Sequence, residues 1–163
     1  MTFLRTLGAV VAVTLIIAYS SIFVVDERQK ALVLQFGQIK AVKENPGLAF
    51  KIPLIQEVVR YDDRILSLDT QPLEVTPLDD RRLVVDAFMR YRITDVVQFR
   101  QAVGTGGTAS AEKRLERILN AALREVLGSV GSNDVLSDGR VSLMEQIRDD
   151  AISEALSLGI AIV

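Results

Sequence analysis

The chain has 163 residues, with 19 Lys and Arg against 21 Asp and Glu, a formal net charge of −2, and neither sign forms a long block. Because nucleic-acid binding needs a concentrated cationic face, this balance predicts no nucleic-acid partner. Cysteine and histidine are both absent from the sequence. Their absence excludes disulfides, thiolate metal sites and cysteine nucleophiles, and it removes the commonest general base and transition-metal ligand.

A five-residue leader, 1–5, precedes twenty consecutive positions without a charge, Thr6 to Val25. At about 1.5 Å per residue, a helix over this run reaches roughly 30 Å, the thickness of the hydrocarbon core of a bilayer. The sequence therefore predicts an uncleaved transmembrane anchor over 6–25 that contacts membrane lipid. The predicted anchor residues are Thr6, Leu7, Val10, Val13, Leu15, Ile16, Ile17, Ile22, Phe23 and Val25.

A cleaved signal peptide is the alternative interpretation of this run, because Ala18–Ser20 offers a small-x-small cleavage site. The apolar run continues through Ile22–Val25, past that site, which favours the anchor. The distribution of Lys and Arg does not decide which end of the predicted anchor faces the cytoplasm. Arg5 lies on one side of the run, while Arg28 and Lys30 lie on the other.

Residues 26–93 carry short strand patterns separated by turn residues. Ala31–Phe36 is followed by Gly37, and Leu48–Ile52 lies between two prolines. The clearest strand is Leu83–Ile93, in which apolar residues alternate and so share one face. This half is predicted to be an antiparallel β-rich subdomain.

Residues 94–163 change to helical periodicity. An apolar stripe over 111–126 predicts one helix, and a second is predicted to begin near Ser142 and stop at Gly159. The residues from Ile160 onward look like the beginning of a further strand. The two halves together predict an α+β fold, with the β-rich subdomain first and a helical subdomain second.

Motifs that carry chemistry are weak. The adjacent carboxylates Asp62–Asp63, Asp79–Asp80 and Asp149–Asp150 do not converge by spacing, since neighbouring side chains diverge on strands and helices. Gly104–Thr108 precedes a helix but lacks the Gly-Lys-Ser/Thr ending of a phosphate cradle, which favours a flexible connector. We therefore predict no catalytic, cofactor or metal site. A membrane-anchored serine hydrolase stays open only because Ser and Lys are both present.

Several segments resemble one family. Gln29–Gln38 and Asn45–Pro53 look like the opening of the stomatin/prohibitin/flotillin/HflKC (SPFH or band 7) family, and Arg60–Arg64, Tyr91–Asp95 and Ala155–Ile160 follow in the family's order. The resemblance spans essentially the whole chain. Its structural motif residues, which place turns at Phe-Gly and Pro-Gly, are Phe36, Gly37, Pro46, Gly47, Phe50 and Pro53.

The resemblance implies an N-terminal transmembrane helix followed by an SPFH domain on the periplasmic side of the bacterial inner membrane. The short leader before the apolar run resembles that of the family's HflC branch. Members of the HflK branch resemble proteins with a longer, glycine-rich leader. The HflC branch implies a non-catalytic scaffold that forms a hetero-oligomer with a HflK-like paralogue and regulates substrate access to an FtsH-like membrane protease. A stomatin/prohibitin-like scaffold that organises lipids is the alternative.

Two charged faces are predicted to contact neighbouring subunits. One carries Asp86, Arg90 and Arg92 on the long strand, and the other carries Arg117 and Arg124 on the first helix. Ordinary solvated charge is the alternative interpretation of both faces. The resemblance also implies a long coiled coil after the last strand, so we expect this chain to be a piece of a longer protein.

Overall fold

A computed structural model describes the backbone of residues 2–137 and 139–163, and the side chains of those residues apart from 2–10 and 13. The chain forms two compact units, Met1–Asp63 and Arg64–Val163, called unit 1 and unit 2 below. Antiparallel sheets occur in both units, and helices dominate the second half of unit 2. The fold is therefore mixed α+β, with a β-rich part followed by helices, as the sequence predicts.

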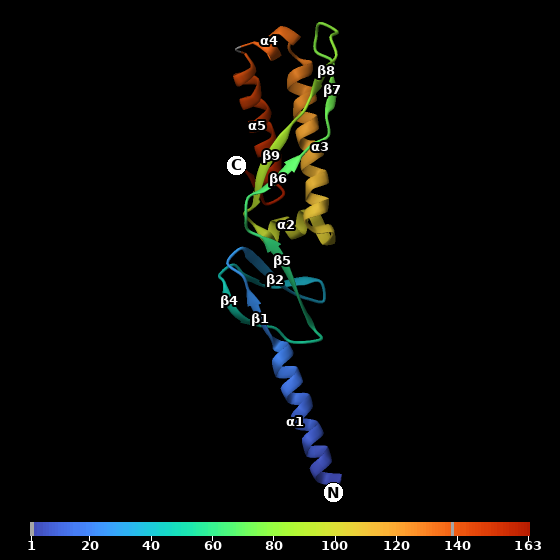
Figure 1. Cartoon of the computed structure of the whole chain (residues 1–163), viewed down its shortest axis with the longest axis vertical. Helices are drawn as coiled ribbons and strands as arrows, with labels where there is room; N and C mark the ends of the chain where they lie inside the picture. Colours follow the sequence, from blue (N-terminus) through green and yellow to red (C-terminus); the bar gives the residue numbers. More distant parts are fainter. Residues whose placement is uncertain (1, 138) are drawn as a thin grey trace. The chain divides into compact units, whose positions relative to one another are not determined.

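Unit 1 begins with a helix that runs directly into a strand (Figure 1). Its elements are α1 (Thr2–Ser21), β1 (Ile22–Val25), β2 (Gln29–Gln35), β3 (Gln38–Lys43), β4 (Gly47–Phe50) and β5 (Gln56–Asp62). β1 pairs with β4, and β2 lies between β3 and β5, all antiparallel. Phe36 and Gly37 both have positive φ (51° and 81°), which gives the tight two-residue turn that joins β2 to β3.

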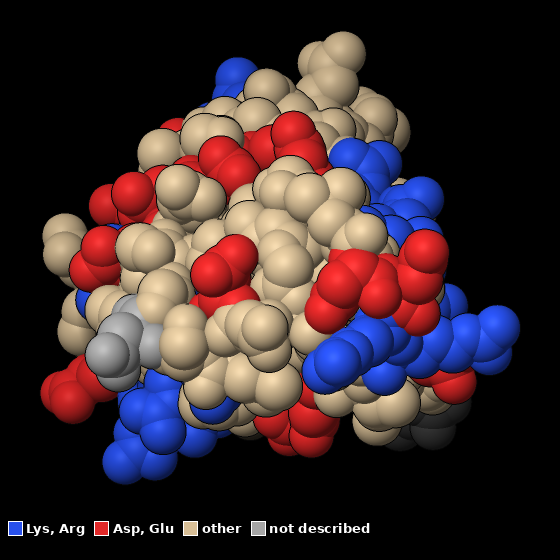
Figure 2. Space-filling model, turned by 90° about the horizontal axis from the view of Figure 1, so that it is seen from above, with Lys and Arg blue, Asp and Glu red and all other residues tan. Residues whose placement is uncertain are grey.

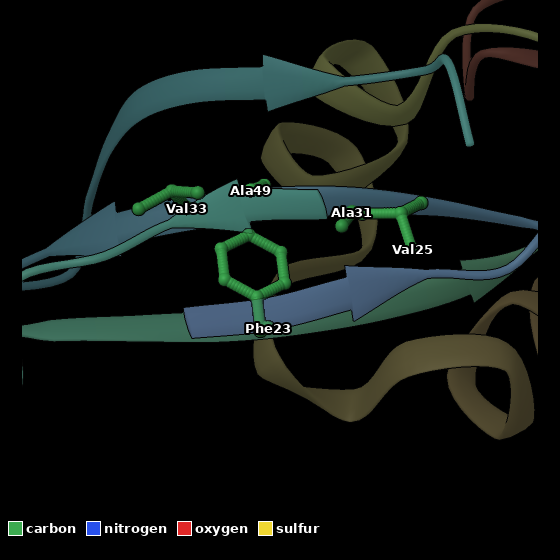
Figure 3. Packing of buried hydrophobic residues seen from close by; sticks show 5 residues of the cluster. All are labelled: Phe23, Val25, Ala31, Val33 and Ala49. Carbon is green, nitrogen blue, oxygen red and sulfur yellow. The ribbon is translucent and has the colours of Figure 1, made fainter. Parts of the chain in front are cut away.

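The core of unit 1 lies between its two small sheets. Phe23 and Val25 of β1 and Ala49 of β4 are buried with Ala31 and Val33 of β2. In Figure 3 the Phe23 ring reaches from β1 toward Ala49 and Val33. Small alanines opposite a phenyl ring let the two sheets approach closely, so a single aromatic side chain fills the space between them.

The predicted anchor is wrong at its C-terminal end. α1 ends at Ser21, and Ile22, Phe23 and Val25 lie in β1, where Ile22 is paired with Phe50. Phe23 and Val25 are only 7% and 2% exposed, because they point into the protein core. β-branched residues favour a strand here. The hydropathy pattern does not reveal the end of the helix at Ser21, because both faces of β1 are apolar.

The remaining anchor residues divide into two groups. The side chains of Thr6, Leu7, Val10 and Val13 lie outside the described residues, whereas Leu15, Ile16 and Ile17 of α1 are exposed. Within the part of the chain that the structure describes, no helix is both long enough and apolar enough to cross a membrane.

Unit 2 combines two sheets with a helical layer. Its elements are β6 (Leu66–Asp69), β7 (Leu73–Val75), β8 (Leu83–Val85), β9 (Phe88–Ile93), α2 (Val96–Val103), the 3-10 turn η1 (Gly104–Gly106), α3 (Gly107–Gly128), α4 (Ser132–Leu136), α5 (Arg140–Leu156) and β10 (Ile160–Ile162). β9 lies between β10 and β6, and β7 pairs with β8. The long helices α3 and α5 pack side by side (Figure 1).

The strand predicted over Leu83–Ile93 is two strands. β8 pairs with β7 and β9 pairs with β6, so the chain changes partner at Asp86 and Ala87. The carbonyl of Ala87 accepts hydrogen bonds from the backbone N–H (3.0 Å) and the hydroxyl (2.8 Å) of Thr70, which fixes the break. Within β9 the predicted alternation holds: Met89, Tyr91 and Ile93 are buried, and the residues between them are exposed.

Both predicted helices are present, with different starts. α3 contains the stripe predicted over 111–126, while α5 begins at Arg140. The hydroxyl of Ser142 donates to the Gly139 carbonyl (2.8 Å), inside the first turn, so Ser142 is not the predicted cap. Gly159 follows α5 with φ of 72°, consistent with the predicted stop signal.

Two features of the helical half differ from the sequence interpretation. Residues Gly104–Thr108, expected as a flexible connector, form η1 and the start of α3. Helix α2 was missed because it is short, although the Asp95 carboxylate caps it by accepting from the N–H groups of Val97 (2.8 Å) and Gln98 (2.9 Å).

The division between compact units also differs from the predicted boundary. The pattern changes from strand to helix near residue 94, but the units divide between Asp63 and Arg64. The reason is the sheet in which β9 pairs on one side with β6 and on the other with β10. Strands from before and after the helices therefore share one sheet.

Candidate interaction surfaces

The small β1–β4 sheet of unit 1 has one buried and one exposed apolar face. The register pairs Ile22 with Phe50 and Val24 with Leu48, and these side chains alternate with the buried residues of the same strands. All four are exposed, Leu48 and Phe50 each by 72%. The exposed apolar residues Ile22, Val24, Leu48 and Phe50 are called the outer apolar face below.

The outer apolar face adjoins the end of α1. The backbone N–H of Lys51, directly after β4, donates to the carbonyl of Ser21, the last residue of α1, over 2.8 Å. Tyr19 and Ile16 on the helix are also largely exposed. Exposed apolar surface therefore continues from α1 onto this sheet, a feature more typical of a binding face than of a solvated surface.

The family motif residues lie in turns and at strand ends of unit 1. Phe36 and Gly37 form the β2–β3 turn, and Pro46 precedes Gly47, which begins β4 with φ of 137°. Phe50 ends β4 and belongs to the outer apolar face. Pro53 lies between β4 and β5, inside the turn that the N–H of Gln56 closes by donating to the carbonyl of Ile52, 2.9 Å away.

The first predicted contact face lies along β8 and β9. Asp86 is exposed at the break between the strands, and Arg90 and Arg92 project from the outer face of β9 with the exposed ring of Phe88. Because Asp86 is outside both strands, the structure places only the two arginines and Phe88 on one regular face.

The second predicted contact face lies on α3. Lys113, Arg114, Arg117 and Arg124 are all exposed, and at about 100° per residue they lie within an arc of about 100°. Ala121 lies within the same arc. This set of five residues is called the basic stripe below. Arg117 Nε donates to the Lys113 carbonyl (3.3 Å), which holds the guanidinium along the helix.

The neighbouring helix α5 carries an acidic outer face. Glu145, Asp149, Ile152 and Leu156 lie within about 60° of one another by the same geometry. They are called the acidic stripe below, and each except the half-buried Ile152 is exposed. Arg148 pairs with Asp149 at 3.3 Å, but both side chains are more than half exposed, so this ion pair contributes little energy.

A shallow hollow of about 620 Å³ lies between α3 and α5. Arg114, Arg117, Ile118 and Ala121 line it from α3, and Ser153, Glu154, Ser157 and Leu158 line it from the end of α5. The lining of the hollow combines two arginines and one carboxylate with small and apolar side chains. The face drawn in Figure 2 carries both signs of charge, with basic groups gathered mainly at the right and lower left.

Two partly buried polar contacts join different elements of unit 2. The Tyr91 hydroxyl donates to Glu112 Oε1 over 3.0 Å, and burial together with this carboxylate raises the pKa of the Tyr91 phenol. The Asp79 carboxylate accepts from the hydroxyl and N–H of Ser132 at the start of α4, and the hydroxyl bond is the main cause that lowers the pKa of Asp79.

The paired carboxylates have structural partners. Asp79 binds Ser132, Asp149 pairs with Arg148, and Asp63 pairs with Lys30 Nζ at 3.0 Å. Among the described residues, no three carboxylates lie close enough together to hold a metal ion. Sequence reasoning missed the outer apolar face, because β1 is apolar on both faces and so shows no alternation of apolar and polar residues.

The fold, with small antiparallel sheets followed by helices and a last strand that returns to β9, defines a known class of domain. The family model "SPFH domain / Band 7 family" matches residues 23–163, and the chain belongs to that family.

Among curated proteins, the chain is similar to "Modulator of FtsH protease HflC" of Escherichia coli (strain K12), with 33% identity over 151 residues. That match covers 89% of this chain and 45% of the relative. It is also similar to "Protein HflC" of Haemophilus influenzae, with 35% identity over 147 residues, covering 86% of this chain and 50% of the relative. The chain spans about half the length of the curated relatives it matches.

Proposed function

We propose that the chain is an HflC-like, non-catalytic scaffold anchored in the bacterial inner membrane by α1, with its main domain on the periplasmic side. It assembles in a hetero-oligomer with a HflK-like paralogue and regulates the access of substrates to an FtsH-like membrane protease. Membership of the SPFH family supports this proposal, as does the name of the Escherichia coli relative, a modulator of FtsH protease.

The observation that carries the membrane part of the proposal is the outer apolar face, continuous with the exposed apolar side chains of α1. Moving a large aliphatic or aromatic side chain from water to an apolar phase gains about 1.5–3 kcal/mol. Ile22, Val24, Leu48 and Phe50 together therefore favour contact with the lipid surface beside the anchor. Tyr19, near the end of α1, is the type of residue enriched at the membrane–water interface.

The proposed mechanism is steric. A domain whose sheet rests on the bilayer and whose helices contact neighbouring subunits forms part of a wall standing on the membrane. Substrates pass or are excluded according to their size and their position in the membrane. Such a mechanism requires no reactive side chain, and the chain contributes rigid surfaces instead.

The test is extraction of the tagged full chain from membranes in a mild detergent, after coexpression with the paralogue and the protease. We expect a large particle that contains both partners. If the tagged chain, with its outer apolar face intact, is recovered without the coexpressed protease, the regulatory role is contradicted. Recovery of a large, lipid-rich particle without protease instead favours the stomatin/prohibitin-like scaffold, whose fold is the same.

A further inference from the structure

Unit 2 contains a second hollow, of about 210 Å³, that adjoins β8. It is lined by Leu83–Asp86 from the strand and its end, Leu123 and Leu127 from α3, and Leu143 and Met144 from α5, with further residues of α4 and α5. This hollow is called the β8 groove below. No residue of the basic stripe or of the acidic stripe lines it, and Figure 1 shows β8, α4 and the start of α5 at the same end of unit 2. The β8 groove is therefore separate from the surfaces described above.

The β8 groove runs along one edge of the strand. Successive side chains of a strand point to opposite faces, yet the four consecutive residues Leu83–Asp86 all line this hollow, as they do when a hollow lies beside a strand edge. No residue of β7 lines it, so it adjoins the edge that β7 leaves free. In the part of the chain that the structure describes, β8 pairs with β7 alone, and no other backbone group bonds to Leu83–Val85. The groove therefore offers backbone groups that can pair with a further strand.

The volume of the β8 groove suits one large side chain. A dry cavity of about 150 Å³ holds a benzene ring, whereas pockets for whole small-molecule ligands are usually about 300–1,000 Å³. At about 210 Å³, the groove fits a single aromatic or branched apolar group. Leu123 and Leu143 are buried, whereas Met144 is 45% exposed, so the apolar lining can be reached from solvent.

Charged side chains lie at the two ends of the free edge. Asp86 follows β8, while Arg82 precedes it and Arg140 begins α5. All three are exposed, and among the described residues none of them forms an ion pair. Asp86 and Arg140 also line the groove. The charges therefore favour an occupant that is basic near Asp86 and acidic near Arg82 and Arg140.

We propose that the β8 groove binds an extended segment of another polypeptide, one without secondary structure of its own, which adds to β8 as an antiparallel strand. A large apolar side chain in the middle of the segment fills the hollow, with a basic residue opposite Asp86 and an acidic residue opposite Arg82. Backbone hydrogen bonds supply affinity in this mode of binding, and the side-chain pocket supplies selectivity. The inference goes beyond the scaffold function proposed above and does not depend on it.

A synthetic peptide of sequence TKVFVET, labelled with fluorescein, is the first probe. In antiparallel pairing its phenylalanine lies opposite Val84 when its lysine lies opposite Asp86 and its glutamate opposite Arg82, and the period of two places all three on one face. We expect saturable binding to the full chain in mild detergent. The peptide TKVAVET should bind at least about tenfold more weakly, because it lacks the apolar anchor. The charge-exchanged peptide TEVFVKT should bind roughly two- to fivefold more weakly.

Two further peptides test the backbone pairing. Each carries N-methyl groups on alternate residues of TKVFVET, one peptide in each phase, so only one of them loses the N–H groups that face β8. We expect that peptide alone to lose binding. In hydrogen exchange, the unmodified probe should slow exchange of the backbone amides within Leu83–Val85.

A matched pair of chain variants tests the groove itself. Met144→Glu places a carboxylate in the apolar lining, while Gln146→Glu makes the same change of charge at an exposed position of α5 outside the groove. Both positions are exposed and glutamate is a good helix former, so α5 is retained. We expect Met144→Glu to weaken binding of TKVFVET at least about tenfold, because the carboxylate must lose water when the anchor enters. Gln146→Glu should leave the affinity unchanged.

The opposite results overturn the proposal. Absence of saturable binding does so, as does equal affinity for TKVFVET and TKVAVET, or equal binding of both N-methylated peptides. Amides of β8 that are protected without any peptide, with protection that rises with chain concentration, would assign the free edge to a second copy of this chain instead. Because none of these measurements involves the paralogue or the protease, the scaffold function stands or falls on its own test.

Discussion

Tyr91 and Glu112 join the central strand of unit 2 to its longest helix. The Tyr91 ring is fully buried in β9, and its hydroxyl donates to Glu112 Oε1 of α3 over 3.0 Å. A hydrogen bond to a charged acceptor contributes about 1.5–3 kcal/mol, more than a typical neutral one. This contact therefore fixes the register between strand and helix as well as adding to stability.

The first prediction follows from removing the Tyr91 hydroxyl. Tyr91→Phe preserves the ring but leaves the Glu112 carboxylate without its donor, and we expect a loss of roughly 1.5–3 kcal/mol. Urea unfolding of the full chain in mild detergent, followed by hydrogen exchange in β9 and α3, measures it. Tyr19→Phe, an exposed tyrosine on α1, is the matched control. Equal stability of the two variants would mean that the Tyr91 contact contributes nothing.

The same phenol predicts alkaline sensitivity. Burial and Glu112 raise the pKa of Tyr91 above its ordinary value of 10.0. Because the folded state favours the protonated phenol, its contribution is fully present below pH 10 and declines as the pH rises above it. We expect the wild-type chain to lose more stability between pH 9 and pH 11 than Tyr91→Phe does. Parallel melting curves of the two chains across this interval test the difference.

The turn after α5 depends on Gly159. Its φ is 72°, and a Cβ built there would lie 2.5 Å from the Asp95 carbonyl oxygen and 2.9 Å from the Phe99 nitrogen. The Gly159 carbonyl also accepts from the N–H groups of Thr94 and Asp95, each at 3.1 Å. Any side chain at 159 therefore disturbs the connection between β10 and the start of α2.

We expect Gly159→Ala to destabilise unit 2 by more than about 1 kcal/mol, because backbone strain and a steric clash combine. Gly128→Ala is the matched control, since it ends α3 without positive φ and its Cβ would meet no atom within 4 Å. Thermal unfolding of both variants measures the effect. A Gly159→Ala melting temperature equal to that of Gly128→Ala would contradict the clash.

Much of the fold could be predicted from local patterns. Alternation in β9 and the stripe of α3 identify most of their buried residues, because one face of each packs on a single core. The stripe included Ile118, which is half-buried, and omitted the buried Leu123 and Leu127. Ile22–Val25 was misassigned because an apolar strand with two apolar faces has the same hydropathy as the end of a membrane helix. The unit boundary also escaped prediction, since pairing of β10 with β9 is a long-range contact that no local pattern records.

Contact surfaces were less predictable than the core. The helical period places Arg117 and Arg124 on one face of α3, but which residues of α5 lie beside that face depends on the packing of the two helices. The link between Asp79 and Ser132 likewise joins residues 53 positions apart, and neither belongs to a recognisable motif. Sequence spacing shows which residues share a helix face, but not what lies opposite.

The Asp79–Ser132 link predicts acid sensitivity at one end of unit 2. Hydrogen bonding from Ser132 lowers the pKa of Asp79 below its ordinary value of 3.8. Its contribution is therefore present above that value and is lost as the pH falls below it. We expect protection of the Ser132 amide in hydrogen exchange to decline in the wild-type chain as the pH falls below 3.8, and Asp79→Asn to weaken it already at neutral pH. Asp80→Asn, at an adjacent exposed position whose positive φ asparagine tolerates, is the control.

The outer apolar face predicts a specific depth of membrane contact. The chain has no tryptophan, so Leu48→Trp introduces a single fluorophore on that face, and Lys40→Trp introduces one at an exposed polar site of β3. With the full chain in vesicles, lipids brominated near the headgroup should quench Leu48→Trp strongly, because the indole lies at the membrane interface. Lys40→Trp should be quenched weakly. Quenching of Leu48→Trp as weak as that expected for Lys40→Trp would show that β1 and β4 do not rest on the lipid, and α1 would then be the only membrane contact left in the proposed scaffold.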